Sequence, residues 1–247
     1  MKCIILAAGY ATRLYPLTEN FPKPLLEVKG KTIIDWLIDD IESSNKITEY
    51  IIVSNHKFIN HFKDWQKNSK LKEKIILIDD GSISNETRLG AVSDILLAIN
   101  EQKIDEDLLV VAGDNVLDFS LNKFINYFED KKHTCIMRYF EENLEKIKKS
   151  ACVLFDENDL VLEMNEKPLE PNSNWCTPPF YIYSKEDVKK VALALEDGCN
   201  KDAPGSFINW LYNKSKVYVM EMPGKRYDIG NLESYNNVNN VYKGITK

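Results

Sequence analysis

The chain has 247 residues, with 38 acidic and 32 basic side chains and a formal net charge of −6. This length suits one large domain or two small ones, and 44% apolar residues are enough for a sizeable core. No apolar run approaches the roughly 20 residues that span a bilayer, and the acidic balance argues against a protein that binds nucleic acid through a basic face.

The first half of the chain alternates between strand and helix patterns. Apolar runs predict strands, and apolar residues spaced along one helix face predict helices. The predicted strands are residues 2–7, 49–54, 74–78 and 108–112, and the predicted helices are residues 32–41, 58–65 and 90–99. This alternation predicts a parallel, doubly wound α/β sheet. Ligands of such sheets bind beyond the carboxyl ends of the strands.

The second half is less regular. The predicted strands are residues 134–139, 151–155, 160–164, 180–183 and 217–222, and the predicted helices are residues 185–195, 205–212 and 232–242. The sequence contains no repeat, no low-complexity tract and no linker rich in Gly, Ser or Pro. We therefore predict a single domain over residues 1–247 with a mixed, mostly parallel sheet.

The cysteines indicate a reducing compartment. All five are widely spaced and none forms a C-x-x-C pair, which argues against a zinc cage or a redox motif. We interpret them as reduced thiols of a cytoplasmic protein. The apolar start of the chain is too short for the hydrophobic region of a signal peptide.

The segment after the first predicted strand, LAAGYATRL at residues 6–14, has a composition suited to phosphate. Small residues around one glycine let main-chain N–H groups approach an anion or a base closely. The segment is neither a Walker loop nor a dinucleotide fingerprint, because both need further glycines or a Gly-Lys-Ser/Thr. Arg13 offers a planar guanidinium, and Lys23 lies between Pro22 and Pro24, which predict an extended backbone that aims its ammonium. Taken singly, each residue also fits a surface turn.

The longer run LAAGYATRLYPLTENFPKPLLEVKGKTII resembles the signature of the sugar-1-phosphate nucleotidylyltransferases. This family includes glucose-1-phosphate thymidylyltransferases and UDP-sugar pyrophosphorylases, and phosphocholine cytidylyltransferases are related. Further landmarks follow in the family's order: Gly113-Asp114-Asn115, Glu166-Lys167-Pro168 and the segment RYDIGNLESY at residues 226–235. The resemblance implies a Rossmann-like nucleotidyltransferase fold without a C-terminal β-helix. It also implies a nucleotide-binding half over about residues 1–120 and an acceptor-binding half over about residues 121–247.

The resemblance also implies residue roles. Arg13 and Lys23 would be catalytic, and Asp114 and Asp228 would hold Mg²⁺. The implied nucleotide-binding residues are Leu6, Ala8, Gly9, Asn85 and Gly90. The implied acceptor-binding residues are Glu166, Lys167 and Tyr181. Of the four arginines, Arg13, Arg88 and Arg226 lie in or beside these motifs, whereas Arg138 has no assigned role.

Three departures from the family pattern bear on substrates. Ala11 replaces a glycine, which costs roughly 1 kcal/mol if the position is left-handed; otherwise the loop differs. Asn85 is a shorter amide than the family's glutamine. Pro178-Pro179 stands in or beside the place of a glycine that lies under the sugar ring, next to aromatic side chains that would also suit a quaternary ammonium.

The resemblance implies a Mg²⁺-dependent reaction of a nucleoside triphosphate with a phosphorylated sugar, which yields an NDP-sugar and pyrophosphate. We expect a pyrimidine nucleotide (UTP, CTP or dTTP) and a product that serves as a precursor of cell-surface polysaccharide. The alternative is a cytidylyltransferase for phosphocholine or another small phosphate ester. A metal-dependent glycosyltransferase is disfavoured, because the only D-x-D, at residues 105–107, lies in a charged connection before a strand. A catalytically inactive nucleotide sensor is disfavoured because Arg13, Lys23, Asp114 and Asp228 are all present. No nucleic-acid or membrane partner is expected, and the oligomeric state stays open.

Overall fold

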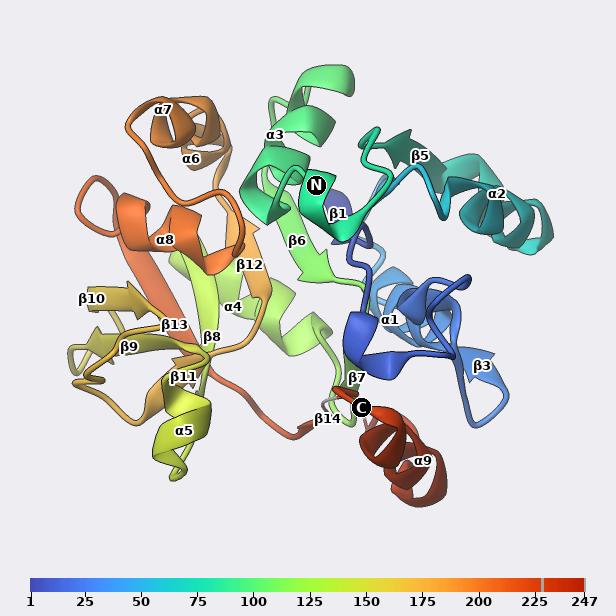
Figure 1. Cartoon of the computed structure of the whole chain (residues 1–247). Coiled ribbons are helices and arrows are strands. Elements are labelled where there is room, and N and C mark those ends of the chain that lie inside the picture. Colours follow the sequence, from blue (N-terminus) through green and yellow to red (C-terminus); the bar gives the residue numbers. More distant parts are fainter. Residues whose placement is uncertain (228, 247) are drawn as a thin grey trace. The chain divides into compact units, whose positions relative to one another are not determined.

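The computed structural model describes residues 1–227 and 229–246, which form two compact units (Figure 1). The first unit contains Met1–Arg88, Ala112–Lys123 and Pro223–Lys247. The second contains Leu89–Val111 and Phe124–Met222. The units therefore differ from the two halves expected from the sequence, because the chain enters each unit more than once. Residues 89–111 belong with the second unit, and the C-terminal residues belong with the first.

The first unit has a parallel sheet made of β1 (Lys2–Leu6), β4 (Tyr50–Ser54) and β5 (Ile75–Asp79). β4 is the central strand of the three, with Ile5 paired to Ile52 and Ile52 paired to Leu77. The chain returns from β1 to β4 through α1 (Ile33–Glu42) and from β4 to β5 through α2 (Ile59–Asn68). Helix α2 lies beside β5 (Figure 1). This is the predicted alternation of strands and helices.

Short elements complete the first unit. The 3₁₀ turns are η1 (Thr12–Leu14), η2 (Lys23–Leu25), η3 (Lys72–Lys74) and η4 (Asn85–Thr87). β2 (Glu27–Val28) pairs with β3 (Lys31–Thr32), and β7 (Val116–Leu117) pairs with β14 (Arg226–Tyr227). The last helix is α9 (Leu232–Val241).

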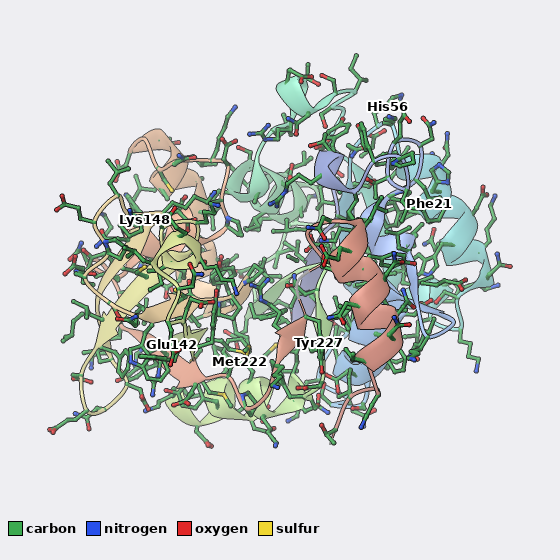
Figure 2. The ribbon with its side chains drawn as sticks, turned by 60° about the horizontal axis from the view of Figure 1, so that its bottom comes forward. Phe21, His56, Glu142, Lys148, Met222 and Tyr227 are labelled. Atoms are coloured by element: carbon green, nitrogen blue, oxygen red, sulfur yellow. The ribbon has the colours of Figure 1, made fainter. Side chains whose placement is uncertain are left out.

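A buried cluster joins these short elements to α1 and α9. Its members come from distant parts of the chain: Leu14, Leu26, Val28, Ile33, Val116, Ile229, Val238 and Tyr242. Tyr227, labelled in Figure 2 beside α9, packs against the cluster with its ring 5.7 Å from that of Tyr242. The cluster is a rigid support for the loops that follow β1 and β6.

The second unit has a larger sheet. Its strands are β6 (Leu108–Ala112, of which Ala112 belongs to the first unit), β8 (Thr134–Phe140), β9 (Ala151–Phe155), β10 (Val161–Glu166), β11 (Trp175–Thr177), β12 (Phe180–Tyr183) and β13 (Val217–Glu221). Their order is β10-β9-β11-β8-β12-β6, with antiparallel pairing throughout this path. β13 pairs with β8 in parallel.

The helices of the second unit are α3 (Ala91–Glu101), α4 (Asn122–Lys131, of which Asn122 and Lys123 belong to the first unit), α5 (Leu144–Ile147), α6 (Lys185–Val188), α7 (Val191–Glu196) and α8 (Gly205–Leu211). α5 covers one face of β9 and β11 (Figure 1), where Ile147 packs on Cys152 and Cys176. α8 lies against β10. Since α5 and α8 are short, each ends near the strand that it covers.

The mixed α/β class is confirmed, with the parallel pairs of the first unit complemented by antiparallel pairs in the second. The helix predicted over residues 185–195 is two helices, α6 and α7. Just before the break, Asp187 is a buried carboxylate that accepts hydrogen bonds from Thr134 and Ser215 at 2.6 Å each. In the part of the chain that the structure describes, no helix is both long and apolar enough to cross a bilayer.

Candidate active site

The loop after β1 is fixed by a buried asparagine. The Asn55 side chain, 0% exposed, donates from Nδ2 to the Ala8 carbonyl at 2.9 Å. Its Oδ1 accepts from the Phe58 backbone N–H at 2.9 Å. Ala8 is buried, whereas Gly9 is exposed with open space beside it, so the Gly9 main chain is accessible. Sequence reasoning missed Asn55, although an asparagine directly after a buried strand is a signal for such a role.

Ala11 has a left-handed backbone, with φ 46° and ψ 42°. Its carbonyl accepts from the Leu14 backbone N–H at 2.9 Å and from Thr18 Oγ1 at 2.8 Å. These two hydrogen bonds hold the turn in a conformation that alanine disfavours by about 1–2 kcal/mol. Of the two alternatives left open by the sequence, the strained turn is the one present.

Arg13 lies in η1, the turn that starts directly after Ala11, and its side chain is exposed. Within residues 1–227 and 229–246, the structure shows no hydrogen bond or ion pair of its guanidinium. An exposed guanidinium without a protein partner keeps all five donors for a ligand.

Lys23 and Asp114 form an ion pair. Lys23 Nζ lies 2.8 Å from Asp114 Oδ2, with the lysine side chain 9% exposed and the aspartate side chain 44% exposed. Pro22 is extended as predicted. Lys23, however, is the first residue of the 3₁₀ turn η2, because a proline such as Pro24 is tolerated in the first positions of a helical turn. In this pair the Asp114 carboxylate is half-exposed and the Lys23 ammonium is buried.

A hydrogen-bond chain continues from Asp114. Asn115 Nδ2 donates to Asp114 Oδ1 at 3.1 Å, and Arg226 Nη1 donates to Asn115 Oδ1 at 3.0 Å. Burial opposes ionisation of Asp114, but the charges of Lys23 and Arg226 outweigh it, so its pKa lies below the ordinary value of 3.8. Asp114 is thus held as a carboxylate at neutral pH. Asn115 and Arg226 are site residues whose roles the sequence alone did not give.

Gly113 allows this carboxylate to follow β6 directly. Its N–H donates to the Leu6 carbonyl at 2.9 Å, and a β-carbon there would lie 2.9 Å from Ile5 Cγ2. Any other residue would push the Asp114 turn away from β1. In this contact Leu6, which the family resemblance assigns to the nucleotide, provides its backbone carbonyl.

Asp228, the second predicted metal ligand, lies outside the described residues. The residues around it are described and have structural roles. Ser234 and Asn231 form a reciprocal cap at the start of α9, and Tyr235 Oη donates to the Glu27 carbonyl at 2.7 Å. In the Glu-Ser-Tyr part of the motif, Ser234 therefore caps α9 and Tyr235 holds it against the Glu27 backbone.

Of the two residues predicted to read the base, Asn85 belongs to the first unit and Gly90 to the second. In the first unit Asn85 begins η4, and its carbonyl accepts from Arg88 Nη1 at 2.9 Å. In the second unit Gly90 precedes α3 with φ 100°. The backbone carbonyl of Lys201 would lie 2.6 Å from a β-carbon at Gly90, so packing within the second unit alone requires a glycine.

The predicted acceptor-binding residues lie in the second unit. Glu166 ends β10, and burial raises the pKa of its carboxyl while Lys167 partly opposes that rise. Lys167 is exposed and left-handed, with φ 49°. Glu166 pairs with Ala151, which pairs with Thr177 on the far side, so the three side chains share one face of the sheet.

The aromatic residues near Pro178-Pro179 are core residues rather than an open cation site. Phe180 and Tyr181 are 0% and 2% exposed. The Arg138 guanidinium already lies over Phe155 at 3.9 Å and over Trp175 at 5.1 Å. Arg138 also pairs with Asp159 at 2.7 Å, which gives the fourth arginine a structural role. A quaternary ammonium would have to displace this packing.

Comparison with known proteins identifies the family. The family model described as Nucleotidyl transferase matches residues 2–244, nearly the whole chain. The chain belongs to this family. A putative mannose-1-phosphate guanyltransferase from Sulfolobus acidocaldarius is 31% identical over 193 residues, 77% of this chain and 50% of the relative. The bifunctional protein GlmU of Methanococcus aeolicus is 32% identical over 80% of this chain and 44% of that protein. The chain thus spans about half the length of these curated relatives.

Solved structures of this nucleotidyl transferase fold match almost completely. A UDP-glucose pyrophosphorylase complexed with UDP-glucose superposes with a TM-score of 0.82 at 20% identity, covering 98% of this chain and 97% of the other. A putative glucose-1-phosphate thymidylyltransferase from Bacillus anthracis, in complex with a sucrose, gives a TM-score of 0.81 at 19% identity, covering 100% and 97%. At such identities the match establishes the fold, and the predicted family membership is confirmed by the family model.

Proposed function

We propose that this nucleotidyl transferase joins a nucleoside monophosphate, taken from a triphosphate, to a sugar 1-phosphate and releases pyrophosphate. The proposal is supported by the family match over residues 2–244 together with the Lys23–Asp114 pair beside the loop that follows β1. The named relatives include a mannose-1-phosphate guanyltransferase and a glucose-1-phosphate adenylyltransferase. We further propose a role in supplying activated sugars for cell-surface polysaccharide.

The residues present fit a divalent cation at Asp114. Among residues 1–227 and 229–246, no cluster of three or more His, Cys, Asp or Glu is arranged to hold a metal ion. Mg²⁺ does not need one, because it is commonly held by one or two carboxylates together with substrate phosphates. Asp114 is ionised and half exposed, as this arrangement requires. When bound there, with Asp228 as the proposed second ligand, Mg²⁺ would supply positive charge to phosphate oxygens.

The chain's own residues account for the rest of the chemistry. The second pKa of a phosphate monoester is about 6, so the attacking phosphate is already ionised at neutral pH and needs no general base. What remains is in-line placement and neutralisation of the polyanion. Arg13 would bind the departing pyrophosphate, Lys23 would stabilise charge at the α-phosphate, and Lys167 would bind the phosphate of the acceptor. Gly9 would offer main-chain N–H groups to the nucleotide.

The identity of the nucleotide base and that of the acceptor can each be tested directly. The named relatives include guanyl and adenylyl transferases, whereas the solved neighbours include UDP-glucose and thymidylyl enzymes. We propose a pyrimidine nucleotide and a hexose 1-phosphate for this chain. The packing of Phe180, Tyr181 and Arg138 disfavours phosphocholine, which stays the alternative acceptor.

The decisive experiment measures pyrophosphate release for UTP, CTP, dTTP, GTP and ATP, each against glucose 1-phosphate, mannose 1-phosphate, N-acetylglucosamine 1-phosphate and phosphocholine. The reactions are run with Mg²⁺ and with excess EDTA. We expect one sugar 1-phosphate to react, with Mg²⁺ required. Arg13→Ala should lower kcat by about 10²–10³ without changing the melting temperature, since its guanidinium makes no described contact. Release with CTP and phosphocholine alone would establish the alternative, and a fully active Arg13→Ala would refute the site assignment.

A further inference from the structure

Gly205, the first residue of α8, lies next to the carboxylate of Glu166, the residue that we propose binds the acceptor. A β-carbon at Gly205 would come closer than 3.0 Å to Glu166 Oε2, and would lie 3.2 Å from Met164 Cε and 3.4 Å from Tyr181 Oη. The Gly205 backbone is not left-handed, so its conformation does not call for glycine. Glycine therefore matters here because it has no side chain, and not because of its backbone conformation. The Glu166 carboxylate occupies the space that a β-carbon would take.

The residues just before Gly205 are tied to the start of α3. The Val92 N–H donates to the Lys201 carbonyl at 2.9 Å, and the Ala91 N–H donates to the Asp202 carbonyl at 3.4 Å. Residues 201–205, here called the bridging segment, thus cap α3 with backbone carbonyls. Gly90 is essential to this contact, because a β-carbon there would lie 2.6 Å from the Lys201 carbonyl oxygen.

The bridging segment has a substrate-related residue at each end. At one end Lys201 contacts Gly90, which the family pattern assigns to the nucleotide, and at the other Gly205 lies beside Glu166, which the pattern assigns to the acceptor. Both contacts lie within the second unit. The segment is five residues long, and at each end a glycine has no room for a methyl group: Gly90 beside Lys201, and Gly205 beside Glu166.

We propose that Gly205 is a positioning residue that leaves the space for the Glu166 carboxylate, and that the bridging segment fixes this space relative to the start of α3. The inference rests on the proposed function, since it assumes that Glu166 contacts the acceptor. It adds residues that lie outside every recognised motif, and it links the binding of the acceptor to the residue that precedes α3.

Gly205→Ala is the primary test. The new methyl group would displace Glu166 Oε2 by at least about 0.4 Å, the difference between the 3.0 Å limit and the 3.4 Å of ordinary contact. Because this oxygen ends a flexible side chain, the carboxylate can move while the backbone stays in place. A misplacement of 1 Å costs about 10²-fold in rate, so we expect kcat/KM for the sugar 1-phosphate to fall about 10-fold or more. The KM for the nucleotide should change less than about twofold.

Two comparisons separate positioning from a general loss of stability. Gly198→Ala is the matched control, because φ is +86° there and nothing lies within 4 Å of the new methyl group. It should lower the melting temperature and leave the acceptor KM unchanged. The pair Glu166→Asp and Glu166→Asp/Gly205→Ala completes a double-mutant cycle. The shorter side chain withdraws the carboxylate, so the added methyl group should then have little further effect.

Gly90→Ala tests the other end of the bridging segment. Its methyl group would push the Lys201 carbonyl, and the shift should reach Gly205. We expect the acceptor KM to rise several-fold in addition to any change in the nucleotide KM. A residue that only reads the base would leave the acceptor KM unchanged.

All variants are assayed by pyrophosphate release with glucose 1-phosphate and mannose 1-phosphate, alongside thermal unfolding. If the wild-type protein is active and Gly205→Ala keeps its acceptor kcat/KM within twofold, the inference is wrong while the proposed function stands. Equal effects of Gly205→Ala in the wild-type and Glu166→Asp backgrounds would also overturn it. A wild-type protein that releases no pyrophosphate with any substrate pair overturns the proposed function, and the inference with it.

Discussion

Lys23→Met removes one ammonium from the candidate site while keeping most of the side chain's length and volume. At the observed 2.8 Å, the Coulomb attraction to Asp114 is about 1.5 kcal/mol in a water-like dielectric and about 6 kcal/mol at an effective dielectric of 20. Burial of the ammonium, which is only 9% exposed, costs several kcal/mol in the opposite direction. In the variant the Asp114 side chain would still be 44% exposed to solvent and near Arg226, so its negative charge would not become a buried, unpaired charge. We therefore expect the unfolding free energy at pH 7 to fall by no more than about 1–2 kcal/mol.

Turnover should respond far more than stability. A preorganised cation aimed at developing phosphate charge is worth about 10²–10³ in rate, so kcat of Lys23→Met should fall by that factor. The acid limb of the stability curve should also move. In the wild-type protein the lowered pKa of Asp114 gives stability that is present above pH 3.8 and lost as pH falls through the lower folded value. Without Lys23 the burial effect gains weight and the folded pKa of Asp114 rises toward 3.8, so less stability is lost on acidification than in the wild-type protein.

The assay pairs initial rates of pyrophosphate release with urea unfolding between pH 3 and pH 8. Lys2→Met is the matched control, because Lys2 Nζ also lies 2.8 Å from a carboxylate, that of Glu49, with side-chain exposures of 18% and 38%. It should leave kcat unchanged. The reasoning is refuted if Lys23→Met lowers kcat no more than Lys2→Met does. A stability loss above about 4 kcal/mol would instead show that Lys23 is chiefly a structural residue.

Two further substitutions test strain and buried charge. Ala11→Gly should raise the unfolding free energy by up to about 1 kcal/mol, because relief of about 1–2 kcal/mol of left-handed strain exceeds the 0.5–1 kcal/mol entropic cost of glycine. Urea unfolding checks this, and a clear destabilisation would contradict it. Glu166→Gln should be more stable than the wild-type protein at pH 7–8, because burial raises the pKa of Glu166 and makes its ionised form costly. That gain should vanish below about pH 4, where both side chains are neutral; thermal unfolding against pH measures it, and a constant difference would count against burial as the cause.

The sequence predicted the parallel part of the fold because β1, β4 and β5 are uninterrupted apolar runs separated by amphipathic helices. The sequence also assigned Lys23 and Asp114 to one site, and the structure shows them in contact although they are 91 positions apart. Only the resemblance to a family made that possible, since neither residue stands out by periodicity or composition. Helix α4 was missed although its buried residues, Phe124, Ile125 and Phe128, follow helical spacing.

Other parts of the site depend on contacts that a linear pattern does not contain. Asn55 is one asparagine among many until its side chain is seen to hold the Ala8 carbonyl. Gly205 looks like an ordinary glycine after a proline, and its role depends on a carboxylate 39 positions earlier in the chain. The burial of Asp187 in α6 likewise depends on distant residues, because the hydroxyls that bind it come from Thr134 and Ser215.

The way in which each unit is assembled from separate stretches of chain limits how this protein can be dissected. The core around Leu14 and Ile33 is completed by Ile229, Val238 and Tyr242, which lie about 200 positions later in the chain. A fragment that ends near residue 120 would therefore lack one wall of its own hydrophobic core, and a fragment that begins there would carry α9 without the surface it packs on. During synthesis the first unit cannot close until the final turn of α9 has left the ribosome. Truncation at either end is therefore a test of folding before it is a test of function.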